Sequence, residues 1–152
     1  MVQWALRMDQ SGPVEIWPIH ISHPNGGQGY KLVENGKAFV FLTDNELGYR
    51  HRGGLRPQDY MEFTQGAELL IHDAEYTPEE YQRTRTWGHS SYLDALDLAM
   101  RARVPRFGLY HHNQDRDDAG VDRILAHCRE IVAQQRSPLE VFAVGQEMEI
   151  SL

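Results

Sequence analysis

Three apolar stretches of the sequence end in side chains that can bind metals or move protons. AFVFL leads within two positions to Asp44, ELLI to Asp73 and FGLY to His111. Two further histidines lie beside small polar residues, His23 before PNGGQG and His89 before a pair of serines. Imidazole and carboxylate together form the ligand set of zinc, manganese or iron in hydrolytic enzymes. These five side chains therefore predict a hydrolytic metal site if the fold brings them together.

The order of the expected elements favours this convergence. Each of the three apolar stretches has the length and composition of a buried strand, and amphipathic segments separate them. Alternation of strands and helices lays strands side by side, so that their C-terminal ends meet at one edge of a sheet. The sequence predicts strands at 37–42, 68–71, 107–110 and 141–144 and helices over 57–66, from 78, over 91–104 and over 118–135. Thr77 and Glu80 predict a capping box at the start of the second helix.

The helix after His89 has clear ends. Ser91 and Asp94 approach a capping-box pattern at its start, and Pro105 stops it because the residue before a proline is pushed out of the helical region. His89 thus lies next to free N–H groups and the positive end of the helix dipole, which attract anions and disfavour an extra proton on imidazole. Two interpretations stay open: His89 contacts a phosphate or leaving group, or it only packs against Trp87.

The N-terminal part has strand and turn signals. Residues 14–21 have strand composition, but Pro18 restricts them to an edge strand or a kinked one. Residues 30–33 and 37–42 predict a hairpin around Asn35 and Gly36, because Asn-Gly is a strong signal for a two-residue turn. The first strand leads to His23 and the second arm of the hairpin to Asp44.

Composition limits the class of protein. The 152 residues predict a single domain, 1–152, and no apolar run is long enough to span a membrane. The N-terminus lacks the pattern of a signal peptide, which predicts a cytoplasmic location. The formal charge of −7 argues against a surface that coats long polyanions. The single cysteine, Cys128, lies on an apolar helical stripe and is expected in the core.

The order of five motifs resembles the C-terminal half of metallo-β-lactamase-fold hydrolases, in the phosphodiesterase branch that includes RNase Z and cyclic-nucleotide phosphodiesterases. The resemblance covers about residues 14–112. The motifs are HPNGGQGY at 23–30, GKAFVFLTD at 36–44, LIHDAEY at 70–76, GHSS at 88–91 and LYH at 109–111.

The resemblance implies a role for each of the five side chains. His23, Asp44 and His111 correspond to metal ligands, with His112 as an extra candidate. Asp73 takes the place of the acid in the His-Glu-Ala-Thr segment of the endonucleases and would orient His89. The histidine would contact the scissile phosphate or protonate the leaving oxygen. The implied cofactor is Zn²⁺, or Mn²⁺ or Fe²⁺ in its place.

The family's H-x-H-x-D-H signature occurs nowhere in this sequence. The three remaining ligands could hold one metal weakly, with incomplete occupancy, but not a two-metal clamp. The implied fold is α/β (α+β): half of an αββα sandwich, with a mixed sheet and helices on one face. The other face of the sheet would be bare and apolar, which is unstable in water. We therefore expect one of three situations: a homodimer, a complementary chain that carries the N-terminal half, or a chain that is a truncation product of a longer enzyme.

Three functions follow from these observations. The first is a metal-dependent phosphodiester hydrolase, acting on a small or cyclic nucleotide rather than tRNA because the chain is acidic and lacks a basic insertion. The second is a non-catalytic half-domain that dimerises or binds a partner, with vestigial polar residues. The third is a hydrolase of the same fold that acts on a thioester or a lactam.

Overall fold

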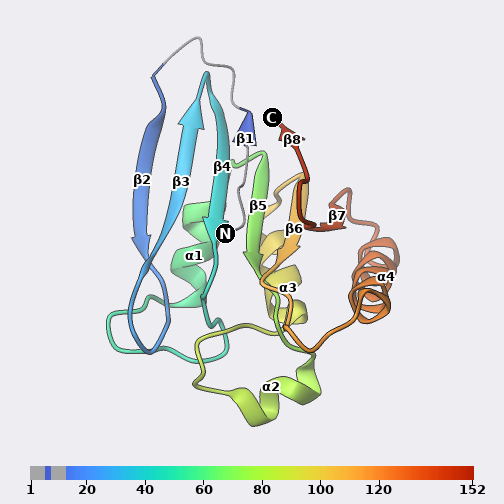
Figure 1. The fold of residues 1–152 in the computed structure, drawn as a ribbon. Coiled ribbons are helices and arrows are strands. Elements are labelled where there is room, and N and C mark those ends of the chain that lie inside the picture. The colour runs from blue at the N-terminus through green and yellow to red at the C-terminus, as the bar shows by residue number, and fades with distance from the viewer. Residues whose placement is uncertain (1–5, 8–12) are drawn as a thin grey trace.

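A mixed six-stranded sheet forms the centre of the computed structural model, which describes residues 6–7 and 13–152 (Figure 1). The pairs β2–β3 and β3–β4 are antiparallel, and the pairs from β4 to β7 are parallel. The ends of β4, β5 and β6 therefore lie at one edge of the sheet, as predicted. Across the sheet the order is β2 (Glu15–His20), β3 (Gln28–Glu34), β4 (Lys37–Leu42), β5 (Leu69–Asp73), β6 (Arg106–Tyr110) and β7 (Glu140–Ala143).

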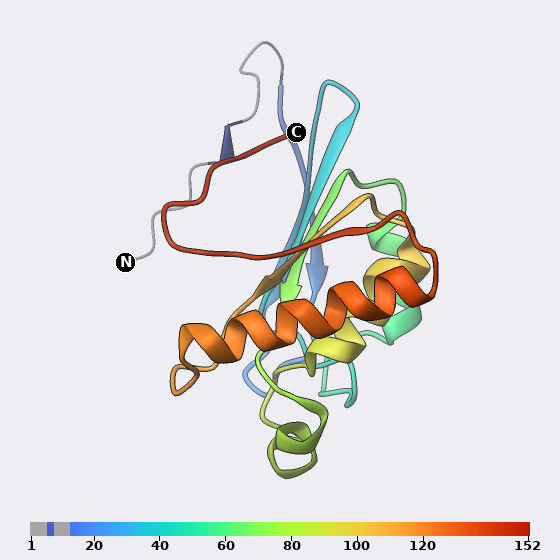
Figure 2. The same ribbon diagram turned by 90° about the vertical axis from the view of Figure 1, so that its right-hand side faces the viewer.

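Helices pack on one face of this sheet. Figure 2 shows α1 (Pro57–Thr64) and α3 (Tyr92–Ala102) on one side, and β1 (Leu6–Arg7) and β8 (Ile150–Ser151) on the other. The long helix α4 (Asp118–Gln134) contacts α3 and β7. The short helix α2 (Pro78–Thr84) lies beyond the edge where β5 ends (Figure 1). The mixed sheet, with helices packed on one face, confirms the predicted fold class.

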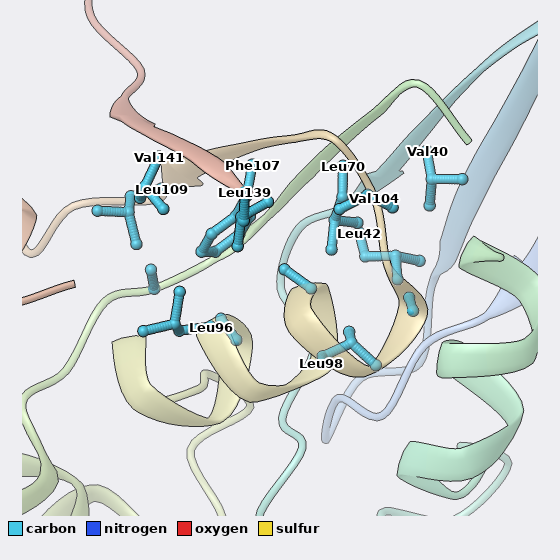
Figure 3. Close-up of a cluster of buried hydrophobic side chains, with 14 of the residues drawn as sticks. Val40, Leu42, Leu70, Leu96, Leu98, Val104, Phe107, Leu109, Leu139 and Val141 are labelled. Carbon is cyan, nitrogen blue, oxygen red and sulfur yellow. The ribbon is translucent and has the colours of Figure 1, made fainter. Parts of the chain in front are cut away.

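The main core lies between the helices and the sheet. Side chains of β4, β5 and β6 point toward α3, which contributes Leu96 and Leu98 (Figure 3). Cys128 of α4 is fully buried in the same cluster, as its position on an apolar stripe predicted. Burying a large apolar side chain contributes about 1.5–3 kcal/mol, so this layer fixes the distance between α3 and the strand ends.

Local signals in the sequence formed as expected. Asn35 and Gly36 have φ values of 51° and 77°, the left-handed conformation that a tight hairpin turn between β3 and β4 needs. Thr77 and Glu80 form a capping box at the start of α2, and the side chain of Ser91 caps α3. Arg103 ends α3 in the left-handed region, two residues before Pro105.

The second face of the sheet is not bare over its whole width. Val144 and Ile150 from the C-terminal segment are buried there against Phe39, Leu69 and Ile71. Among residues 13–152, large apolar side chains that remain exposed on this face lie on β2 and β3, where Ile16 is 60% and Tyr30 38% exposed. The C-terminal segment was not predicted to cover the sheet, because its apolar residues are separated by charged ones.

No helix among the described residues is long and apolar enough to cross a membrane. The N-terminal segment to which the signal-peptide expectation applies lies outside the described residues, apart from β1.

Candidate metal and acid–base site

The five side chains singled out from the sequence gather at one edge of the sheet. Asp44, Asp73 and His111 lie at the ends of the parallel strands β4, β5 and β6. The His89 ring stacks on the His111 ring with centroids 4.4 Å apart, and the His23 ring meets that of His89 edge-on at 5.6 Å. The parallel pairing of the strands and the loop that precedes α3 produce this gathering.

The donor atoms fit a metal ion. Asp44 Oδ2 and His111 Nδ1 are 3.6 Å apart, close to the roughly 3.4 Å that separates two ligands at tetrahedral zinc with bonds of about 2.1 Å. Two overlapping groups have donor atoms within 4.8 Å of one another: His23, Asp44 and His89, and Asp73, His89 and His111. The three predicted ligands are thus divided between two groups that share His89. His112 belongs to neither group.

Two of the predicted ligands have an unusual backbone. Asp44 has a φ of 53° and His111 a φ of 55°, in the left-handed region that non-glycine residues rarely adopt. Such positions cost on the order of 1 kcal/mol or more and persist where surrounding structure holds them, often at functional sites. At both positions the chain turns sharply where a strand ends, which places the side chain at the sheet edge.

Asp73 and His89 form the shortest ion pair of the site. Asp73 is fully buried, and its Oδ2 accepts a hydrogen bond from His89 Nδ1 at 2.6 Å. Its Oδ1 accepts from the backbone N–H of Ser90 at 3.1 Å. Nδ1 of His89 therefore carries a proton, and Nε2 is the atom left to contact a substrate.

The pKa of His89 differs from the expectation. Burial lowers the pKa of His89, but the hydrogen bond and charge of Asp73, together with the charges of Glu75 and Asp44, raise it above its usual value. The helix end was expected to disfavour a proton on His89. That expectation is wrong because a buried carboxylate at hydrogen-bond distance outweighs the dipole of α3, which begins only at Tyr92. His23 behaves oppositely: burial and the charge of His89 lower its pKa, which favours the neutral, metal-binding form.

Glu75 is a member of the site that sequence reasoning missed. Its Oε2 lies 3.5 Å from His89 Nδ1 and 3.6 Å from His111 Nε2. Its Oε1 accepts a hydrogen bond from Asn113 Nδ2 at 3.0 Å. Glu75 occupies the position of threonine in the His-Glu-Ala-Thr segment. A carboxylate in place of this threonine was the sequence signal that could have identified Glu75 as a site residue. It gives the site an additional negative charge.

Asn45 and Glu46 were also missed, and both are buried. Asn45 accepts a hydrogen bond from Ser22 N at 2.8 Å and bonds His72 Nε2 at 3.1 Å, which ties the segment before His23 to β5. The Glu46 carboxylate bonds four groups from three segments: His51 Nε2, Tyr81 Oη, Thr86 N and Gly88 N, at 2.7–2.8 Å. Polar residues after a strand ordinarily indicate a solvated turn, so no sequence signal distinguished these two.

A cavity of about 470 Å³ opens beside the histidines. This volume lies within the range of small-molecule sites, about 300–1,000 Å³. The lining residues include aromatic, imidazole, amide and carboxylate side chains: Glu75, Tyr76, Thr84, Trp87, His89, His111, His112, Asn113, Gln114 and Asp115. A ligand in this cavity would contact His89 and His111 together.

Solved structures of other proteins share the fold of this chain. The metallo-β-lactamase fold protein YhfI of Bacillus subtilis superposes with a TM-score of 0.65 at 17% identity, over 91% of this chain and 50% of that one. Human tRNase Z, short form, superposes with a TM-score of 0.62 at 20% identity, over 94% of this chain and 43% of that one. The chain has the fold of the metallo-β-lactamase superfamily. The superposition covers about half of each of these longer chains, and the predicted resemblance to a metallo-β-lactamase fold is confirmed.

Sequence comparison agrees with this fold. No family model matches the chain. Ribonuclease Z of Thermoplasma acidophilum is 38% identical to it over 72 residues, which cover 47% of this chain and 24% of that protein. The chain therefore spans about a quarter of the length of this curated relative and about half of the superposed metallo-β-lactamase-fold structures.

Proposed function

We propose that the chain supplies the acid–base pair and part of the metal site of a metal-dependent phosphodiester hydrolase. The observation that carries this proposal is the buried Asp73–His89 pair at 2.6 Å, beside the Asp44–His111 pair at one sheet edge. An imidazole held by a buried carboxylate is suited to general acid–base catalysis, and the mixed donors are suited to a divalent metal.

His89 would protonate the leaving oxygen. Asp73 holds its Nδ1–H, which fixes the ring and stabilises the imidazolium form, so that Nε2–H is available to donate. His23, Asp44 and His111 would hold the metal, with Glu75 as a nearby carboxylate. A bound divalent ion supplies a Lewis acid and lowers the pKa of water. The raised pKa of His89 keeps more of it protonated near neutral pH, as a general acid requires.

The substrate that we propose is a small or cyclic nucleotide phosphodiester. The similarity to ribonuclease Z supports phosphodiester chemistry. The net charge of −7 disfavours binding of tRNA, a long polyanion whose many phosphates require basic side chains. A phosphodiester rather than a thioester or a lactam is favoured by the hydrogen bond between Asp73 and His89, which keeps a proton donor beside the candidate ligands.

Metal titration tests the ligand assignment. Purified chain titrated with Zn²⁺ or Mn²⁺ in a calorimeter should bind the ion, and Asp44→Asn and His111→Ala should weaken binding by at least tenfold, because each removes one of few ligands. Asp97→Asn is the matched control, since Asp97 lies exposed on α3. Equal affinity in the wild type and the two ligand variants would refute the assignment.

Hydrolysis of bis-p-nitrophenyl phosphate, measured by absorbance with and without added metal, tests the chemistry. We expect metal-dependent turnover once the missing half is supplied. Absence of turnover in a metal-loaded, fully assembled preparation would contradict the proposal.

We further propose that a second polypeptide completes the site, either another copy of this chain or a chain with the complementary half. The exposed side chains of Ile16 on β2 and Tyr30 on β3 support an interface there, because covering apolar surface with another chain lowers the free energy. Native mass spectrometry and light scattering should give a dimer, or a complex after mixing with the N-terminal half of a relative. A monodisperse monomer with full hydrolytic activity would contradict this.

The alternative function is a non-catalytic module that dimerises or binds a partner. Its motivation is the absence of H-x-H-x-D-H from the sequence. This alternative predicts assembly without turnover, and robust metal-dependent hydrolysis by the chain alone would exclude it.

A further inference from the structure

Trp87 is a large apolar side chain at the mouth of the cavity. It is 62% exposed and lines the same cavity as His89 and His111. Leaving an indole in water forgoes much of the free energy of its burial, so an exposed tryptophan on a cavity wall indicates a surface that a ligand covers. The cavity therefore has an aromatic wall next to the proposed acid.

The backbone on both sides of Trp87 is fixed. Thr86 N and Gly88 N donate to the two oxygens of Glu46 at 2.7 and 2.8 Å, and this carboxylate is fully buried. Trp87 N donates to Thr84 O at 3.0 Å. Because this backbone is anchored, a ligand that covers the indole has only the side-chain rotamer of Trp87 to order, which lowers the entropic cost of binding.

The other walls indicate the kind of group that lies against the indole. Tyr76 adds a second aromatic surface, and Asn113 and Gln114 offer amide donors and acceptors. The lining also includes the carboxylates Glu75 and Asp115, and none of the described residues that line the cavity is lysine or arginine. With carboxylates and without these cations, this part of the cavity does not favour a negatively charged group against the indole. A planar, uncharged aromatic ring with hydrogen-bonding edges, such as a nucleobase, matches all these walls.

We propose that Trp87 is a stacking platform for the base of a nucleoside phosphodiester whose phosphate lies at His89. This inference rests on the proposed function and names the part of the substrate beyond the phosphate. His89 follows Trp87 by two positions, with only Gly88 between them, so at most roughly 7 Å of backbone joins the two residues, which is the scale of one nucleoside. The base and the phosphate of one nucleotide can therefore reach both side chains.

Binding of two probes tests the proposal. Adenosine 5′-monophosphate and ribose 5-phosphate share the sugar phosphate and differ in the base. NMR titration of the whole chain, loaded with Zn²⁺, should give a lower Kd for the nucleotide by roughly 5- to 100-fold, the range of base–aromatic stacking. Trp87→Leu should remove this difference, and Trp87→Phe should keep most of it because an aromatic face remains.

Trp17→Leu is the matched control, since Trp17 is 55% exposed on β2. It should leave the selectivity for the base unchanged. Equal affinity of the wild type for both probes would overturn the proposal. An equal loss of affinity for both probes in Trp87→Leu would also overturn it. A change in the native mass of Trp87→Leu with unchanged selectivity for the base would overturn it as well, because it would place Trp87 in an interface between chains.

The outcome is separable from that of the proposed function. If the chain selects the base through Trp87 but the metal-loaded, fully assembled preparation hydrolyses no phosphodiester, the platform stands and the proposed function fails. If it hydrolyses bis-p-nitrophenyl phosphate with metal but does not distinguish the probes, the proposed function stands and the platform fails.

Discussion

Protonation of one buried histidine should control stability at mildly acidic pH. His72 of β5 is fully buried. Its Nδ1 bonds the backbone oxygen of Asp73 at 2.7 Å and must donate, so its Nε2 accepts from Asn45 Nδ2 at 3.1 Å. A second proton would point at the Asn45 amide, which already donates. Burial therefore lowers the pKa of His72 to about 4, and the ring is neutral in the folded protein.

The sign and size of the effect follow from linkage. The unfolded chain takes up a proton on His72 near pH 6.5, and the folded chain does so only near pH 4. Stability from this group is thus fully present above pH 6.5 and is lost as pH falls toward 4. The two pKa values give a loss of about 2 kcal/mol between pH 7 and pH 5, and about 3 kcal/mol below pH 4.

Urea unfolding of the wild type and of His72→Gln, at pH 7 and pH 5, measures this contribution. The variant is expected to be less stable at pH 7, but its loss between the two pH values should be smaller than that of the wild type by about 2 kcal/mol. His20→Gln is the control because His20 is exposed on the edge strand β2. A variant with the same pH dependence as the wild type would refute the argument.

Three further outcomes are expected. Asp73→Asn should lower hydrolysis by roughly 10²- to 10⁴-fold by removing the carboxylate that holds His89, while metal affinity measured by calorimetry falls less than in Asp44→Asn. Gly88→Ala should weaken metal binding, because φ at this glycine is 101° and a Cβ would overlap the His23 ring; unchanged affinity would count against the site geometry. Burial raises the pKa of Cys128 to about 12, so Ellman's reagent should label it only in urea, and fast labelling of the native chain would contradict its burial.

The fold was largely predictable because its elements carry local signals. The Asn35–Gly36 turn, the Thr77 capping box and Pro105 each act through a few neighbouring residues, and each formed as predicted. Parallel strand ends meet at an edge in any such sheet, which is why Asp44 and Asp73 were expected to lie near each other.

The parts that could not be predicted depend on contacts between distant segments. Burial of Glu46 requires Thr86 and Gly88, about forty residues away in the chain, to turn their N–H groups inward. The proton affinity of His89 depends on whether Asp73 or a helix end is nearer, which spacing along the chain does not reveal. The division of the metal-ligand atoms into two groups that share His89 likewise could not be predicted, because it depends on the positions of the strands in space.

The buried Glu46 carboxylate also has a kinetic consequence. This carboxylate holds the loop of His51, the middle of α2 through Tyr81 and the backbone on both sides of Trp87. If one of these segments moves away, the buried charge loses a hydrogen-bond partner and becomes exposed, which destabilises the contacts of the other two. The three segments should open as one cooperative unit rather than separately. The amide protons of Thr86 and Gly88 would then exchange with solvent at similar rates, and the segments that line the cavity would fold and unfold together.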